Sequence, residues 1–291
     1  MDILPEWENI DPIELKGILL VVGATDVGKS TFARYLYGCL RKEGKRVAYL
    51  DGDPGQGRLG PPTTMTLTTE KIEENDPFPQ QGSVWRRFVG SSTPVGHMLP
   101  MLVGAARLIK AAQGAGMEIV IYDTTGLIDP NRGGLHLKLA KINLLRPRML
   151  FAIQRAGELD PLVNPLRRSR GFEVVQLPVS PSVKRRDLEG RRAFRAEKFA
   201  QYFAGSQTVT LSWADLAVFP TSAFRPNLLV ALEDVKGYLL GLGIVQQINE
   251  DSKEVTLLTP LSSPAAIESL QLGDIVLDPE TFFDQPVREL A

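Results

Sequence analysis

The sequence predicts an α/β fold in which a parallel sheet is flanked by helices, as in P-loop NTPases, followed by a smaller β-rich domain. Residues 17–22 form a short apolar run typical of a buried strand, and a glycine-rich loop and a helical pattern follow it directly. Two further apolar runs, 46–50 and 118–122, each end in an acidic loop. This order of strand, loop, helix and strand favours parallel strands.

The first part of the chain alternates predicted strands and helices. Residues 1–16 form a lead-in, in which we expect Trp7 to be a packing anchor. The Pro- and Thr-rich residues 58–82 are predicted to be mainly loop. Helices are expected at 29–43, 98–113, 135–145 and 184–203, and strands at 17–22, 46–50, 84–89, 118–122, 149–153 and 173–177.

The pattern changes near residues 205–225. Short apolar runs separated by Gly, Pro, Asn and Asp, with no helical pattern between them, indicate β-structure. These runs are 208–211, 228–232, 243–245, 255–258 and 274–277. We therefore predict a P-loop domain over residues 1–205, which includes an Arg-rich lid at about 184–203, and a small β-rich domain over residues 206–291.

Composition excludes several classes of protein. Of the 291 residues 43% are hydrophobic, enough for a substantial core, and the net charge of −1 gives no overall basic excess. A single cysteine, Cys39, excludes an internal disulfide and a cysteine metal cluster and suits a reducing cytosol. We see neither a signal peptide nor an apolar run long enough to span a bilayer, so a cytoplasmic location without a membrane partner is expected.

The segment from Gly23 to Thr31 matches the phosphate-loop pattern G-x-x-x-x-G-K-S/T. A strand that leads through glycines into a helix start leaves backbone N–H groups directed at one point, which binds phosphate. Lys29 is expected to reach the β- and γ-phosphates of ATP, and Ser30 to ligate Mg²⁺. An accidental glycine-rich turn would not require this strand and helix context. The predicted ATP-binding residues are Gly23, Ala24, Thr25, Asp26, Val27, Gly28, Lys29, Ser30 and Thr31.

Three acidic residues, Asp51, Asp53 and Asp123, stand at predicted strand ends, where ligands bind in open α/β sheets. A kinase uses one carboxylate to help hold Mg²⁺ and often another to accept the proton of the attacking hydroxyl. Asp51 and Asp53 point the same way on an extended chain, which suits such shared work. The alternative is that these Asp and Gly residues are present only because they favour a turn. The sequence leaves open whether Asp51 or Asp123 is the main Mg²⁺ partner.

An Arg-rich segment is the second strong signal. Arg191 and Arg195 are four residues apart, hence on one helix face, whereas Arg186 is expected to reach the site from the helix entry. Arginines stabilise the charge of a transferring phosphoryl group. The alternative is a solvated, salt-bridged surface helix. Next to a phosphate loop we favour a mobile lid with Arg186, Arg191 and Arg195 as catalytic residues.

These motifs, in this order, resemble the Clp1/Grc3/Nol9 family of polynucleotide 5′-hydroxyl kinases over about residues 15–280. The resemblance is carried by the phosphate loop, Asp51 to Gln56, Ser92-Thr93-Pro94, Asp123 to Gly126, the three arginines and the C-terminal Leu239 to Val245. It implies ATP-dependent transfer of the γ-phosphate to the 5′-hydroxyl of RNA or DNA, single-stranded or frayed at its end.

The resemblance also assigns roles to individual residues. Lys29 and Ser30 match the ATP and Mg²⁺ loop, and Asp53 matches the acidic residue that activates the 5′-hydroxyl, with Asp51 near the metal. Gln56 and Thr93, with Pro94 in the same loop, match positions that clasp the terminal nucleotide's phosphate. Arg186, Arg191 and Arg195 match the lid arginines.

Two features depart from the family pattern. Leu127 stands where the family often has a Trp that stacks on the terminal base, and Asp129 replaces a frequent basic residue. The chain begins almost at the first kinase strand, which suits a compact prokaryotic-type member. Two other functions remain open at this point: a P-loop kinase of a small metabolite, and a non-catalytic ATP-binding assembly factor in RNA processing.

Overall fold

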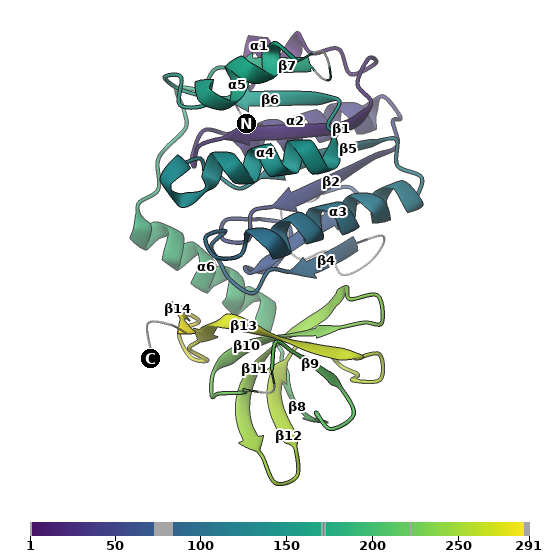
Figure 1. Cartoon of the computed structure of the whole chain (residues 1–291), viewed down its shortest axis with the longest axis vertical. Coiled ribbons are helices and arrows are strands. Elements are labelled where there is room, and N and C mark those ends of the chain that lie inside the picture. The colour runs from purple at the N-terminus through teal and green to yellow at the C-terminus, as the bar shows by residue number, and fades with distance from the viewer. Residues whose placement is uncertain (1, 73–83, 170, 172, 222, 288–291) are drawn as a thin grey trace. The chain divides into compact units, whose positions relative to one another are not determined.

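The computed structural model describes residues 2–72, 84–169, 171, 173–221 and 223–287. Its contacts group the chain into two compact units, drawn together in Figure 1. The first comprises Met1–Asp53, Thr66–Val84 and Pro94–Arg186, and the second comprises Pro54–Met65, Trp85–Thr93 and Asp187–Ala291. The domain boundary near residue 205 stays a prediction.

A seven-stranded sheet forms the core of the nucleotide-loop part of the chain, in the order β4-β3-β2-β5-β1-β6-β7. The five strands from β2 to β7 along this order pair in parallel, which confirms the predicted parallel sheet, whereas β3 pairs with β2 antiparallel. The strands are β1 (Gly17–Gly23), β2 (Val47–Gly52), β3 (Thr64–Thr68), β4 (Val84–Phe88), β5 (Ile119–Thr124), β6 (Met149–Ile153) and β7 (Glu173–Leu177).

The strand β3 corrects the prediction that residues 58–82 are mainly loop. All five of its residues, Thr64–Thr68, are buried. Threonine is β-branched and therefore suits a strand, but the neighbouring prolines obscured this signal in the sequence. Residues 73–82 of the predicted loop lie outside the described residues.

Helices cover both faces of this sheet (Figure 1). The helix α2 contacts β1, β2 and β5, and α3 contacts β2 and α4. Figure 1 shows α3 and α4 in front of the sheet and α2 behind it. The chain moves one way along the sheet from β1 through α2 to β2, and the other way from β5 through α4 to β6. Because each crossover is right-handed, α2 and α4 are expected on opposite faces of the sheet. The helices are α1 (Pro5–Glu8), α2 (Lys29–Lys42), α3 (Met98–Gly114), α4 (Gly134–Leu145) and α5 (Asp160–Arg167), with a 3₁₀ turn η1 (Pro130–Arg132).

The helices α2, α3 and α4 confirm the predictions, whereas α1 and α5 were not predicted. Trp7, in α1, is buried and meets the Phe32 ring edge-on with 5.3 Å between centroids, so its predicted role as a packing anchor is confirmed. No helix within the described residues is long and apolar enough to cross a membrane.

A second seven-stranded sheet lies in the second unit, in the order β14-β13-β10-β11-β12-β8, with β9 paired to β13. All its pairs are antiparallel except β9 with β13. Its strands are β8 (Gln207–Ser212), β9 (Ala217–Phe219), β10 (Leu228–Glu233), β11 (Leu239–Asn249), β12 (Glu254–Thr259), β13 (Ser269–Leu277) and β14 (Asp284–Pro286). The predicted β-rich texture is confirmed, and β9 and β14 are additions to it.

The helix α6 (Leu188–Phe203) belongs to this second unit. It begins four residues later than the predicted start at 184, because Asp187 caps it by accepting a hydrogen bond from the Gly190 N–H at 2.7 Å. The buried side chains Phe199 and Phe203 pack in one hydrophobic cluster with Leu242 and Ile275 of the sheet.

Candidate active site

The phosphate loop joins the end of β1 to the start of α2. Gly28 has a φ of 90°, a left-handed conformation that favours glycine, and no side chain caps the helix among the described residues. A Cβ on Gly23 would lie 2.5 Å from the Ile153 carbonyl oxygen, so only glycine fits there. The first N–H groups of α2 therefore stay available to an anion, and the helix dipole favours negative charge.

Lys29 lies across this loop. Its side chain is buried, and the Nζ donates to the Ala24 carbonyl at 2.6 Å. Burial lowers the pKa of Lys29, and the nearby carboxylates Asp123, Asp53 and Asp26 oppose that shift. An ammonium held over a cradle of backbone N–H groups is the arrangement that binds the phosphates of a nucleotide.

Two arginines, Arg155 and Arg186, contact Asp26 of the phosphate loop. The Arg186 N–H donates to Asp26 Oδ2 at 3.1 Å, and the Arg186 Nε lies 3.8 Å from Asp26 Oδ1. Arg155 Nη2 donates to the Asp26 carbonyl oxygen. The structure therefore places Arg186, one of the predicted lid arginines, directly beside the phosphate loop, while its catalytic role stays a prediction.

Asp51 and Asp123 are register partners on the neighbouring parallel strands β2 and β5. The two carboxylates differ in their surroundings. Asp51 Oδ1 accepts the Asp53 N–H at 3.3 Å, which curls the chain after β2. Asp123 Oδ2 accepts the Tyr49 hydroxyl at 3.1 Å, whereas its buried Oδ1 has no hydrogen-bond partner among the described residues.

The electrostatics of Asp123 link it to the phosphate loop. Burial raises the pKa of Asp123, while the positive charge of Lys29 and the nearby Ser30 hydroxyl oppose that rise. A buried carboxylate oxygen without a partner, next to the Ser30 hydroxyl, suits a divalent cation, which prefers oxygen ligands. No group of three or more His, Cys, Asp or Glu gathers at one point in the part of the chain described here. A cation would therefore complete its shell with phosphate and water oxygens, as Mg²⁺ commonly does.

Two buried lysines of α4 were missed at the sequence level. Lys138 Nζ donates to Thr124 Oγ1 at 2.8 Å and to the Thr125 carbonyl, and so holds the turn after Asp123. Lys141 Nζ lies 4.7 Å from the centre of the Tyr122 ring. Burial lowers the pKa of both lysines, that of Lys141 to about 7. Two lysines three residues apart within a mostly apolar helix were the available signal.

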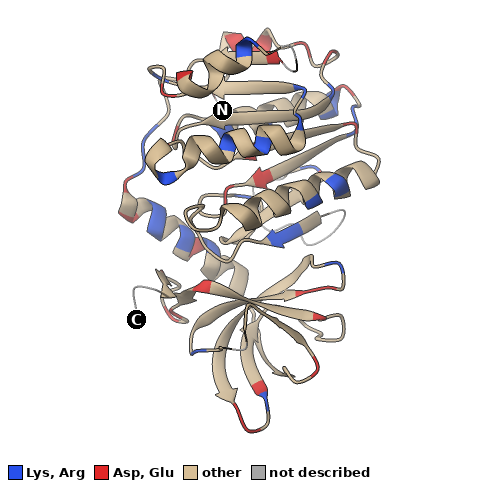
Figure 2. Ribbon diagram, viewed as in Figure 1, with Lys and Arg blue, Asp and Glu red and all other residues tan. Residues whose placement is uncertain are grey.

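The remaining predicted residues lie mostly in the second unit, where α6 carries many basic positions (Figure 2). Gln56 Nε2 donates to the Arg191 carbonyl at 3.4 Å, and Arg195 Nη1 donates to the same oxygen at 3.4 Å. The Thr93 N–H donates to Ser91 Oγ at 3.3 Å. Pro94 is buried and groups with the first unit. The structure therefore brings Gln56, Arg191 and Arg195 together through one carbonyl.

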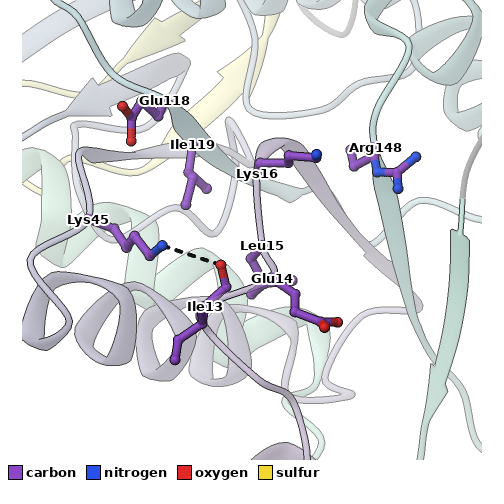
Figure 3. A pocket seen from close by; sticks show the side chains of 8 residues that line it. All are labelled: Ile13, Glu14, Leu15, Lys16, Lys45, Glu118, Ile119 and Arg148. Carbon is purple, nitrogen blue, oxygen red and sulfur yellow. Dashed lines mark hydrogen bonds between the residues drawn. The ribbon is translucent and has the colours of Figure 1, made fainter.

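A hollow of 640 Å³ lies elsewhere on the first unit and is shown in Figure 3. Its walls come from the amino-terminal ends of the strands, because Ile119 begins β5, Lys45 stands two residues before β2 and Arg148 directly precedes β6. The phosphate loop stands at the carboxyl ends of these strands, so this hollow is not the nucleotide site. Its lining residues are Ile13, Glu14, Leu15, Lys16, Lys45, Glu118, Ile119 and Arg148.

The fold and the loop together define a P-loop nucleotide-binding protein. Residues 23–205 match the family model described as "mRNA cleavage and polyadenylation factor CLP1 P-loop". The chain belongs to this Clp1 P-loop family, which confirms the resemblance drawn from the sequence.

Relatives and solved structures agree with this assignment. The chain is 30% identical to a polyribonucleotide 5′-hydroxyl-kinase of Thermococcus kodakarensis, over 88% of this chain and 87% of that protein. It is 32% identical to a polyribonucleotide 5′-hydroxyl-kinase of Methanocaldococcus jannaschii, over 89% of this chain and 87% of that protein. Among solved structures, wild-type Clp1p in complex with Pcf11p shares the fold, with a TM-score of 0.66, 14% identity and coverage of 89% of this chain and 74% of that one.

Proposed function

We propose that this protein transfers the γ-phosphate of ATP to the 5′-hydroxyl end of a polynucleotide. The observation that carries the proposal is a complete phosphate loop next to a buried acidic strand end, in a chain that aligns over nearly nine-tenths of its length with two archaeal polyribonucleotide 5′-hydroxyl-kinases. RNA is the substrate in those relatives' names, so RNA is the first choice here.

The nucleotide end of the site is assigned to the first unit. The N–H groups from Gly23 to Thr31 hold the triphosphate, and the Lys29 ammonium neutralises its β- and γ-phosphates. Bound Mg²⁺ would supply charge neutralisation at the transferring phosphoryl group. Ser30 and Asp123 are the residues that would hold it, because Asp123 Oδ1 is buried and lacks a partner among the described residues. Asp51 then acts as a neighbour to the metal rather than as its main ligand.

Asp53 is assigned as the base that accepts the proton of the attacking hydroxyl. It follows β2 and is only half-buried, so a substrate hydroxyl has access to its carboxylate. The 5′-oxygen forms a bond to the γ-phosphorus, the bond from that phosphorus to the bridging oxygen of ADP breaks, and the hydroxyl proton passes to Asp53. Gln56, Thr93 and Pro94 are assigned to the terminal nucleotide, and Arg186, Arg191 and Arg195 to the charge on the moving group.

One assay tests the proposal. The wild-type protein is incubated with ATP labelled at the γ-phosphate and with 5′-hydroxyl RNA, 5′-hydroxyl DNA or mononucleosides. Label on an oligonucleotide is the expected result. Label on mononucleosides alone would indicate a small-metabolite kinase, and tight ATP binding without any transfer would indicate a non-catalytic assembly factor. Either outcome would overturn the proposal.

Asp53→Asn is the matched catalytic variant. It keeps the size and the backbone hydrogen bond to Asp51 but removes the base. We expect ATP binding to persist while transfer is lost, and an active Asp53→Asn protein would remove Asp53 from the role of base. Glu43→Gln, an exposed change after α2, serves as the control.

A further inference from the structure

A buried carboxylate in the C-terminal strand β14 joins two segments that the proposed function needs. Asp284 accepts a forked pair of bonds from Arg195: the Nε lies 2.9 Å from Oδ1, and the Nη2 lies 2.9 Å from the same oxygen. Ser92 Oγ donates to Asp284 Oδ2 at 2.7 Å. One side chain thus ties helix α6 to the loop that contains Thr93.

The neighbours of Asp284 reinforce this connection. The Phe282 ring stacks on Phe203 of α6 with 6.1 Å between centroids, and the Arg192 guanidinium lies 5.6 Å from the centre of the Phe283 ring. Three consecutive residues, 282–284, therefore each contact a different residue of α6. A helix held at three points along its length has its rotation fixed, so the direction in which its arginines point is fixed too.

The loop that carries Ser92 is also anchored to the C-terminal sheet. The Asp274 N–H donates to the Gly90 carbonyl at 2.8 Å. Gly273 allows this approach, because a Cβ there would lie 3.1 Å from the Gly90 oxygen and 2.9 Å from the Leu229 oxygen. Ser92 then meets Asp284, and the next residue, Thr93, is the one assigned to the terminal nucleotide.

The same network reaches Gln56. Arg195, held by Asp284, donates through Nη1 to the Arg191 carbonyl, and Gln56 Nε2 donates to that oxygen as well. Gln56, the Arg191 carbonyl, Arg195 and Ser92 are therefore linked through one set of hydrogen bonds. The buried Asp284 makes the strongest type in this set, a charge-assisted fork.

From this arrangement we propose that Asp284 is a positioning residue for the polynucleotide substrate. It fixes Arg195 and Ser92 and thereby sets the α6 arginines and the Thr93 loop in the arrangement that receives a nucleic-acid 5′ end. The inference rests on the proposed function, and it gives the C-terminal sheet a role in the reaction: it supplies the anchor for the substrate-binding segments.

The test uses the full-length protein and steady-state kinetics with 5′-hydroxyl RNA and ATP varied separately. Asp284→Asn keeps the shape and an acceptor for Ser92 but loses the charge that holds the fork. Since misplacement of a positioning group by about 1 Å can cost ~100-fold in rate, we expect kcat/KM for RNA to fall ~10- to 100-fold, with KM for ATP unchanged within about twofold. Glu280→Gln, an exposed change four residues away, is the matched control and should leave both constants unchanged.

A double-mutant cycle with Ser92→Ala separates positioning from general loss of stability. Both changes act through one carboxylate, so their effects on kcat/KM for RNA should be smaller together than the sum of the two alone. If Asp284→Asn does not fold, Ser92→Ala alone still tests the inference. It removes a single hydroxyl and should also lower kcat/KM for RNA. Asp284→Glu, which restores the charge, should recover part of the loss.

Three outcomes are distinguishable. Wild-type transfer together with a selective loss for RNA in Asp284→Asn supports the inference. Wild-type transfer with unchanged constants in the variants, and only a lower melting temperature, overturns the inference and leaves the proposed function standing. No transfer by the wild type to any oligonucleotide overturns the proposed function, and the inference with it.

Discussion

Lys141 offers a prediction whose size follows from its surroundings. Its ammonium is fully buried over the Tyr122 ring and has no hydrogen-bond partner among the described residues. Burial lowers its pKa to about 7, although the charges of Asp53 and Asp123 oppose that shift. In the unfolded chain a lysine has a pKa of about 10.4. Lys141→Met keeps the length and apolar stem of the side chain and removes only the ammonium.

The sign of the effect follows from proton binding. Between pH 7 and about 10.4 the unfolded chain holds the Lys141 proton and the folded chain releases it, so the free energy of unfolding of the wild type rises with pH in this window. The cost of burying the charge is greatest at and below pH 7. From the two pKa values, the free energy of unfolding of the wild type should rise by about 2 kcal/mol relative to that of Lys141→Met between pH 7 and pH 9.

Urea unfolding at pH 7 and pH 9 measures this difference. Trp7 lies in the same unit as Lys141, so its fluorescence reports the relevant transition once Trp85 and Trp213 are replaced by Phe. Lys110→Met, at an exposed position of α3, is the control and should show no such pH dependence. A stability difference between wild type and Lys141→Met that stays constant from pH 7 to pH 9 would refute the reasoning.

Three further predictions concern the reaction site. Gly126→Ala should weaken ATP binding by about tenfold or more in isothermal titration calorimetry, because the new Cβ would lie 2.6 Å from Thr25 Oγ1 and displace the phosphate loop; equal affinity would contradict that packing argument. Lys29→Met should lower transfer by roughly 10³-fold with an unchanged circular dichroism spectrum, since the ammonium held by the loop is lost; activity within tenfold of wild type would speak against its role. Leu127→Trp should tighten binding of a 5′-hydroxyl oligonucleotide by about 1–3 kcal/mol in fluorescence anisotropy if the terminal base lies over this position; an unchanged Kd would place the base elsewhere.

Local patterns in the sequence predicted the central features of the fold. The strand that ends at Gly23, the helix that begins at Lys29 and the acidic end of β5 each depend on neighbouring residues, so their signals can be read along the chain. Where a local signal was weak, the prediction failed. The strand β3 lies between prolines and consists largely of threonine, and Asp187 was not recognised as the cap that delays the start of α6.

The candidate site could be predicted only in part, because its remaining contacts join distant segments. Arg195 and Asp284 are 89 positions apart, and the fork between them depends on how β14 pairs with β13. Lys138 reaches Thr124 only because α4 packs back on the sheet. Patterns within one segment carry no information about such partners, so the sequence pointed to Arg195 but not to the carboxylate that holds it.

The most direct test of the proposed function locates the transferred phosphoryl group. A 5′-hydroxyl RNA and the same RNA with a 5′-phosphate are each incubated with ATP and the wild-type protein, and nuclease fragments are analysed by mass spectrometry. We predict that one phosphoryl group appears on the 5′-terminal fragment of the 5′-hydroxyl RNA and none on the 5′-phosphate RNA. A phosphoryl group on an internal or 3′ fragment, or none on either RNA, would contradict the proposed function.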